Sequence, residues 1–227
     1  LIKIMERLRD PKKGCSWDKK QTLKSIIPHS IEEIYELSEE IYNNNYKGIK
    51  EELGDVLFQV IYLSQISKEK NKFDFNEVVD AISKKMIDRH PHVFKNYKFK
   101  NKNEFKIFWE KSKNKKNKNL FSNIPKCYPE IVKTVKIQKK VANLGFEYKN
   151  NLSAINKIIE EANELKVEIK KNNKKKIKEE LGDLIFATID VSRKLNFDPQ
   201  YILHLANKKF TKRWVKVEKF IKSDKKN

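Results

Sequence analysis

The chain has 227 residues, of which 38% are hydrophobic, and carries a formal net charge of +20 at pH 7. This hydrophobic fraction is too high for wholesale disorder, and no stretch approaches the roughly 18–20 unbroken apolar residues that a membrane helix needs. The lysines are spread along the whole chain among many Asn and Ile residues. This pattern indicates a general bias of the composition toward Lys, Asn and Ile, and not a basic surface that binds nucleic acid. We therefore expect no membrane and no nucleic acid as the main partner.

The cysteine content points to a reducing compartment. Only Cys15 and Cys127 are present, with no CxxC pair, which excludes a disulfide framework and disfavours a structural zinc site. Charges at Lys3, Glu6 and Arg7 interrupt the start of the chain, so it does not resemble a signal peptide. We expect a cytoplasmic protein.

The first half of the chain shows helical periodicity. With five glycines and six prolines, the long 3.6-residue apolar patterns predict an all-α protein with little sheet. A helix is expected at residues 31–43, capped by Ser30 with a glutamate three residues later. Further helices are predicted at residues 49–68 and 76–89, the second ended by Pro91. Residues 97–119 are lysine-rich and are predicted to form a partly helical linker.

The heptapeptide IKEELGD occurs at residues 49–55 and again, unchanged, at residues 177–183. The same shift places Glu32, Glu33 and Glu36 on Glu160, Glu161 and Glu164. The pattern therefore predicts two copies of one helical-bundle module, residues 1–115 with the linker and residues 116–227. The helices expected in the second copy span residues 154–170, 177–195 and 199–220.

Each module carries two acids three residues apart on one predicted helix and two more on the next. The eight acids are Glu33, Glu36, Glu52 and Asp55 in the first module and Glu161, Glu164, Glu180 and Asp183 in the second. A spacing of three puts both carboxylates on one helical face, and antiparallel pairing would bring four together. Asp55 and Asp183 precede strongly apolar segments, so we expect both to be buried, which requires a compensating charge.

Clustered carboxylates favour a hard divalent cation with oxygen ligands, Mg²⁺ or Mn²⁺. A solvated acidic face is the alternative explanation for one helix alone, but duplication of the whole arrangement disfavours it. A di-iron site would need Glu-x-x-His, whereas the sequence has Glu52-x-x-Asp55 and Glu180-x-x-Asp183.

The acids within EEIYE and EELGD resemble the hallmark of MazG-type nucleoside triphosphate pyrophosphohydrolases. The resemblance extends to MERLRDPKKGCSWDKKQT near the start, to RHPHVF at residues 89–94 and to KIQKKVANLGFEY at residues 136–148. Ser16 stands where this family usually has proline. The resemblance implies an all-α homodimer that uses Mg²⁺ to hydrolyse a nucleoside triphosphate to the monophosphate and pyrophosphate, with the eight acids as metal ligands.

The resemblance also implies a set of nucleotide-binding residues. These are Lys157, Lys176, Glu179, Lys209 and Arg213 in the second module, with Lys85 and Arg89 at the equivalent spacing in the first. A solvated helix face is an equal alternative for Lys209 and Arg213. Glu160 or Glu32, beside the metal ligands, is our candidate for accepting a proton. The base preference and the active module stay open, and a catalytically degenerate module that binds nucleic acid or protein is the competing hypothesis.

Overall fold

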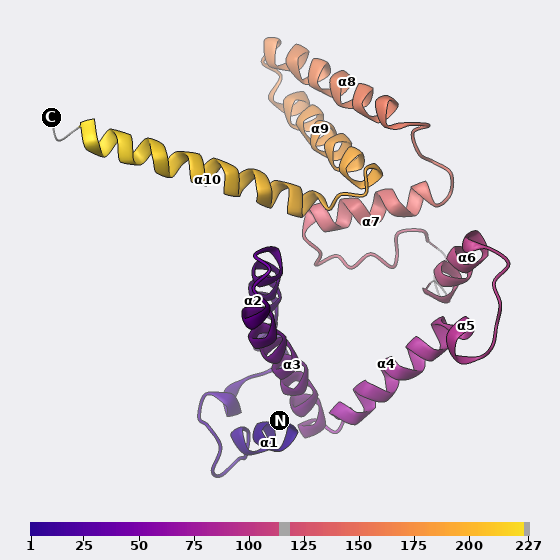
Figure 1. Cartoon of the computed structure of the whole chain (residues 1–227), viewed down its shortest axis with the longest axis vertical. Helices are drawn as coiled ribbons and strands as arrows, with labels where there is room; N and C mark the ends of the chain where they lie inside the picture. The colour runs from indigo at the N-terminus through magenta and orange to yellow at the C-terminus, as the bar shows by residue number, and fades with distance from the viewer. Residues whose placement is uncertain (114–118, 225–227) are drawn as a thin grey trace. The chain divides into compact units, whose positions relative to one another are not determined.

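The computed structural model describes residues 1–113 and 119–224, and every regular element within these ranges is a helix (Figure 1). The all-α fold predicted from the sequence is confirmed. The chain divides into two compact units, Leu1–Lys113 and Asn114–Asn227. The module boundary predicted between residues 115 and 116 lies outside the described residues.

The N-terminal unit is organised around a helical hairpin in which α2 and α3 pack against each other. Both α1 and α4 contact α3, so this helix is the centre of the unit. In chain order the helices are α1 (Ile2–Leu8), a short 3-10 turn (Asp18–Lys20), α2 (Leu23–Tyr42), α3 (Tyr46–Glu69), α4 (Phe75–Arg89), α5 (Pro91–Phe94) and α6 (Lys102–Lys113). The end of α4 before Pro91 is as predicted.

Helix α2 begins earlier than the sequence pattern indicated. Thr22 caps it: its side chain accepts a hydrogen bond from the backbone N–H of Ser25, and the Ser25 hydroxyl accepts one from the N–H of Thr22. The predicted cap at Ser30 is therefore wrong. Ser30 lies inside α2, where its hydroxyl donates to the carbonyl of Ile26 at 3.1 Å. Pro28 lies inside this helix, where it cannot donate an intrahelical hydrogen bond.

The connection between the two helices of the hairpin consists of asparagines. Asn44 adopts a φ of 54°, in the left-handed region that Asn tolerates better than most residues. The Asn45 side chain then caps α3 by accepting from the N–H of Gly48. The C-terminal unit repeats this connection, with Asn172 at a φ of 54° and Asn173 accepting from the N–H of Lys176. These short connections hold each pair of helices antiparallel.

The core of the N-terminal unit lies where α1, α2 and α3 meet. Its fully buried members are Met5, Ile26, Ile61, Tyr62 and Ile66. The Tyr62 hydroxyl donates to a carboxylate oxygen of Asp18 at 2.8 Å, and burial raises the pKa of the phenol. Arg9 binds Glu69 through two hydrogen bonds of 2.7 and 2.6 Å, which fixes α1 to the end of α3.

The segment predicted as a linker is partly helical, because α6 occupies residues 102–113 of it. Its aromatic residues pack on the short helix α5: the His92 ring lies 5.5 Å from that of Phe99 and 5.2 Å from that of Phe105. Residues 114–118 of the predicted linker lie outside the described residues.

The C-terminal unit contains a second hairpin, formed by α8 and α9. Helix α7 packs on α9, and α10 contacts both α7 and α9. The helices are α7 (Glu130–Ala142), α8 (Asn151–Lys170), α9 (Lys174–Lys194) and α10 (Pro199–Asp224). The chain leaves α7 through Gly145, whose φ of 87° favours glycine. The buried apolar residues are Ala154, Ala187, Ile189 and Val191.

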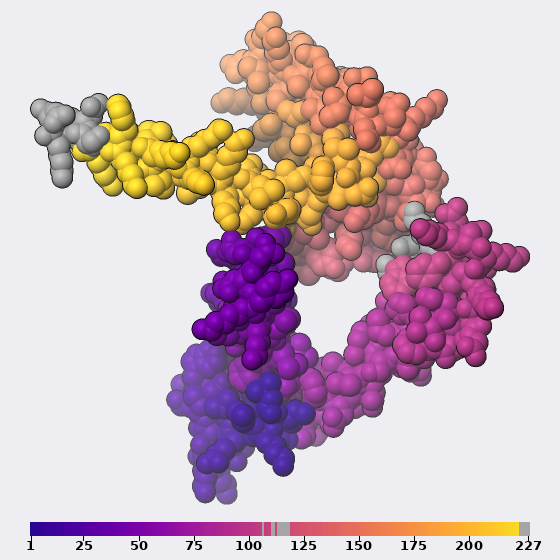
Figure 2. All heavy atoms as spheres, viewed as in Figure 1, coloured from indigo at the N-terminus to yellow at the C-terminus, as the bar shows by residue number. Residues whose placement is uncertain are grey.

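Much apolar surface is uncovered in the single chain. On the face drawn in Figure 2, the yellow spheres of α10 extend away from the rest of the C-terminal unit. Phe210, Trp214, Val217 and Ile221 recur on one side of this helix, and all four are exposed. Within the described ranges, none of the helices combines the length and apolar character needed to span a bilayer.

Candidate metal centres and an adjoining pocket

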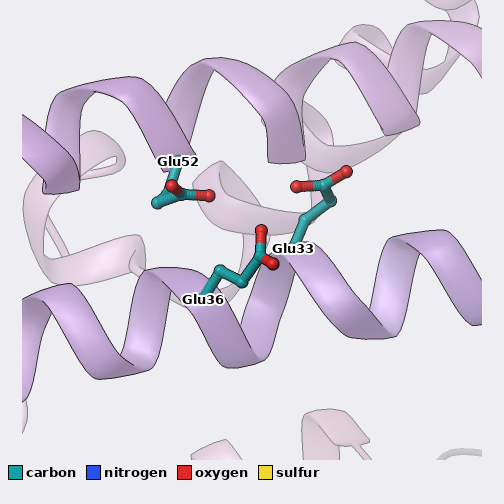
Figure 3. Close-up of side chains that lie close together, drawn as sticks. All are labelled: Glu33, Glu36 and Glu52. Carbon is teal, nitrogen blue, oxygen red and sulfur yellow. The ribbon is translucent and has the colours of Figure 1, made fainter.

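The first candidate metal centre lies between the helices of the N-terminal hairpin. Glu33 and Glu36 come from α2 and Glu52 comes from α3, and one carboxylate oxygen from each lies within 4.8 Å of the others. Figure 3 shows the three side chains converging in the space between the two helices. The spacing of three residues on α2 and the antiparallel pairing with α3 produce this arrangement, which contains three of the four acids that the sequence predicts to meet.

The second candidate centre repeats the first in the C-terminal hairpin. Glu161 and Glu164 on α8 and Glu180 on α9 bring their carboxylate oxygens within the same 4.8 Å of one another. Glu161 is the most buried of the six acids, with 5% of its surface exposed. The Lys157 ammonium, 2.7 Å from this carboxylate, supplies part of the charge compensation that such a position requires.

The electrostatics of both triads favour a cation. Partial burial is the main cause that raises the pKa of Glu52, and the negative charges of Glu36 and Asp55 raise it further. Partial burial and the charge of Glu164 likewise raise the pKa of Glu180. One carboxylate oxygen of Glu52 is buried without a hydrogen-bond partner among the described residues. An all-carboxylate donor set with an unsatisfied oxygen suits Mg²⁺ or Mn²⁺, which take oxygen ligands.

The predicted burial of Asp55 and Asp183 is wrong for the single chain, because both side chains are exposed. Neither belongs to the triads, although Asp55 lies near enough to raise the pKa of Glu52 and Asp183 to raise that of Glu180. Two of the apolar residues nearest Asp55 are themselves largely uncovered: Leu53 is 52% exposed and Leu57 46%. The described residues of the chain therefore cover the later part of α3 but leave these two leucines about half exposed.

The two candidate proton acceptors are exposed and lie beside basic residues. Glu160 binds the Lys157 ammonium at 2.8 Å, and Glu32 lies 3.8 Å from the His29 ring. Both are adjacent in sequence to a member of a triad, and their role stays a prediction.

Two of the predicted nucleotide-binding lysines lie at the second centre. Lys157 binds Glu161 at 2.7 Å in addition to Glu160, and these two hydrogen bonds raise the pKa of its ammonium group. Lys176 binds Glu179 at 2.8 Å at the start of α9, and Lys176 lies one turn before Glu180.

The other basic residues are not brought to the acids in the single chain. Lys209 and Arg213 lie on α10 with exposed side chains, and within the described residues no hydrogen bond or ion pair joins them to the triad. Lys85 is exposed on α4, and the Arg89 guanidinium lies over the Trp109 ring at 5.7 Å from its centroid.

A cavity of about 500 Å³ adjoins the second centre. Glu161, Lys157 and Asp183 line the side nearest the acids, and residues from α7, from the following loop and from α9 line the remainder. The sequence reasoning missed three of its polar residues, Gln138, Asp190 and Arg193. The available signals were the KIQKKVANLGFEY segment and an acid at position 190 within the otherwise apolar part of α9.

Comparison with known proteins identifies the two hairpins as repeats of one domain. The family model described as the MazG nucleotide pyrophosphohydrolase domain matches residues 21–94 and again residues 149–217. Each match contains one acid triad.

Similar proteins extend over nearly the whole chain. A nucleoside triphosphate pyrophosphohydrolase of Escherichia coli K12 is 38% identical over 97% of this chain and 87% of its own. The nucleoside triphosphate pyrophosphohydrolase/pyrophosphatase MazG of Thermotoga maritima is 39% identical over 99% of this chain and 86% of its own. An uncharacterised protein of Bacillus subtilis, YabN, is 37% identical over 97% of this chain and 46% of its own.

Proposed function

Because the chain belongs to the MazG nucleotide pyrophosphohydrolase family, we propose that it hydrolyses nucleoside triphosphates to a nucleoside monophosphate and pyrophosphate. The observation that carries this proposal is the pair of carboxylate triads, each built from two helices of one family domain. A binding protein without catalytic activity has no evident use for two clusters of mutually repelling acids.

The acids of each hairpin would hold Mg²⁺, with Mn²⁺ as the second choice. In the C-terminal unit these are Glu161, Glu164 and Glu180, with the exposed Asp183 as a fourth ligand. Bound Mg²⁺ neutralises charge on phosphate oxygens and lowers the pKa of a coordinated water.

The basic residues would bind the triphosphate. Lys157 and Lys176 lie beside the second triad and can exchange their present carboxylate partners for phosphate oxygens. Attack on the α-phosphorus in line with the departing pyrophosphate gives the two products. Glu160 in the C-terminal unit, or Glu32 in the N-terminal unit, would accept the proton of the attacking water.

The uncovered apolar surface supports a homodimer. The side of α10 that carries Phe210, Trp214, Val217 and Ile221 is exposed in the single chain, and a second copy offers the same face for a two-fold interface. Lys209 and Arg213 lie on this helix, so the interface would also determine where these two cations meet a substrate. Both cysteines are free and exposed, in keeping with a cytoplasmic location.

Product analysis tests the proposed reaction. The protein is incubated with each nucleoside triphosphate and Mg²⁺, and the products are separated for wild type, Glu180→Gln and Glu52→Gln. Monophosphate and pyrophosphate are expected, with a loss of about a hundredfold or more in the variant of the working unit. Glu130→Gln makes the same charge change at an exposed residue of α7 and should leave turnover unchanged.

Two outcomes would contradict the proposal. Release of orthophosphate would mean that a different phosphoanhydride bond is cleaved. No turnover of any triphosphate by folded protein would favour the alternative of a binding module.

A further inference from the structure

The cavity beside the second triad has the size and lining of a small-molecule site. Its volume of about 500 Å³ is within the range of roughly 300–1,000 Å³ that ligand pockets occupy. Glu161 belongs both to the triad and to the wall of the cavity. A ligand whose phosphates were held by a metal ion at the triad would therefore extend directly into the cavity.

Gln138 is the polar residue that points to a ligand. It lies on α7 with only 2% of its surface exposed, and its amide nitrogen donates to the backbone carbonyl of Phe186 at 2.8 Å. This hydrogen bond determines the orientation of the amide, since the nitrogen must face the carbonyl. The amide oxygen is consequently an acceptor, and it is buried without a partner among the described residues. A buried unpaired acceptor is costly unless a ligand satisfies it.

The other polar residues of the wall are largely occupied by one another. The Arg193 guanidinium binds Asp190 at 2.8 Å and Glu147 at 2.8 Å, and the Lys194 ammonium lies 3.8 Å from the same Glu147 oxygen. The aromatic residues Phe186 and Tyr148 also line the cavity and offer surface on which a flat ring can stack.

The N-terminal hairpin fills the corresponding positions. The repeat places Gln59 on Ala187 and Tyr62 on Asp190. The Gln59 amide nitrogen donates to Glu33 at 3.2 Å, and Tyr62 is 2% exposed within the core. Replacement of these two large side chains by Ala187 and Asp190 removes the atoms that would otherwise occupy the cavity.

We propose that the cavity binds the nucleobase of a nucleotide whose phosphates lie on the second triad, and that the Gln138 amide oxygen accepts a hydrogen bond from an N–H of that base. This inference rests on the proposed function and adds a substrate preference to it. A nucleotide whose base has an N–H donor is preferred to one whose base has none. Gln138 is thus a specificity-determining residue for the edge of the base.

The test compares purine nucleotides that carry an N–H donor on the base with one that carries none. Purine riboside 5′-triphosphate has no N–H on its base, whereas ATP and GTP do. Wild type should show a kcat/KM for the better of ATP and GTP that exceeds the value for the purine riboside compound by about tenfold. In Gln138→Met, which keeps the side-chain volume and removes the amide, this ratio should fall to near one. The ratio within one variant does not depend on the fraction of folded protein.

Gln65→Met is the matched control, because Gln65 occupies the position of Arg193 in the N-terminal hairpin and should leave the ratio as in wild type. Equal turnover of both substrates by wild type, or an unchanged ratio in Gln138→Met, would overturn the inference while leaving the proposed reaction intact. If no triphosphate is turned over, calorimetric binding of AMP and purine riboside 5′-monophosphate decides. Equal affinity, or no binding of either, overturns the inference in that case too.

Discussion

The α2–α3 and α8–α9 hairpins share a backbone connection and an acid triad but differ in the residues around the acids. Both use an asparagine at a φ of 54° and a second asparagine as the cap of the following helix. At the positions of Lys157 and Lys176 the N-terminal hairpin has His29 and Gly48. Two lysines near the acids suit a polyanionic substrate, so the C-terminal hairpin is the better equipped of the two.

The interior beside the triads differs as well. Tyr62 is sealed in the N-terminal core by its hydrogen bond to Asp18, whereas its counterpart Asp190 lies at the wall of a cavity and binds Arg193. A repeat can therefore keep its acid triad while exchanging a packed core for a pocket. The acids alone do not distinguish the two units, but their neighbours do.

The largest expected effect tests whether the triads are equivalent. Mg²⁺ at a hundred times its Kd should raise the free energy of unfolding by about 2.7 kcal/mol for a unit that binds it. Glu52→Gln should remove the increase from the N-terminal unit and Glu180→Gln from the C-terminal unit. Thermal unfolding with increasing Mg²⁺ measures this, and hydrogen exchange assigns it to a unit.

The same variants should be more stable than wild type without metal. The pKa values of Glu52 and Glu180 are raised above 4.5, so their ionisation destabilises the folded state as pH rises through the folded pKa. At neutral pH the glutamine variants avoid this repulsion, and their melting temperatures in a chelator should exceed that of wild type. An Mg²⁺-independent melting temperature in wild type would contradict both triads as metal sites.

The sequence predicted the triads because spacing on a helix and antiparallel pairing are local properties. Glu33 and Glu36 share a face by periodicity alone, and the short asparagine connection brings Glu52 opposite them. Burial could not be predicted in this way. The apolar face around Asp55 requires a covering surface, and the periodicity does not say whether the same chain supplies it.

The pocket was harder still to predict, because it depends on Ala187 and Asp190 standing where the other repeat has the larger Gln59 and Tyr62. Gln138 lies on α7, far in sequence from the Phe186 carbonyl that orients it. Its significance emerges only when α7 packs on α9 and when Ala187 is compared with Gln59 in the other repeat.

An intermediate effect tests the sealed core of the N-terminal unit. Tyr62→Phe keeps the ring and removes the hydroxyl, leaving the carboxylate of Asp18 without its 2.8 Å donor. The free energy of unfolding of this unit should fall by about 1 kcal/mol. Hydrogen exchange of α3 amides localises the loss. Ser64→Ala is the control, since the Ser64 hydroxyl donates only to its own helix at Val60, and it should change stability less. Equal losses would mean that the hydroxyl of Tyr62 contributes no more than an intrahelical bond.

The smallest effect concerns the ion pair that joins α1 to α3. Hydrogen bonding by Arg9 lowers the pKa of Glu69 from 4.5. A depressed carboxyl pKa contributes stability above the unfolded value, and this contribution is lost as pH falls through the folded value. Below about pH 5, the stability of wild type should therefore decline more steeply with acidification than that of Glu69→Gln. The difference is small because the Glu69 side chain is 35% exposed and water screens the pair. Parallel declines would show that Arg9 is held by the carbonyls of Asp18 and Gln21 and that the C-terminal end of α3 needs no charge at this position.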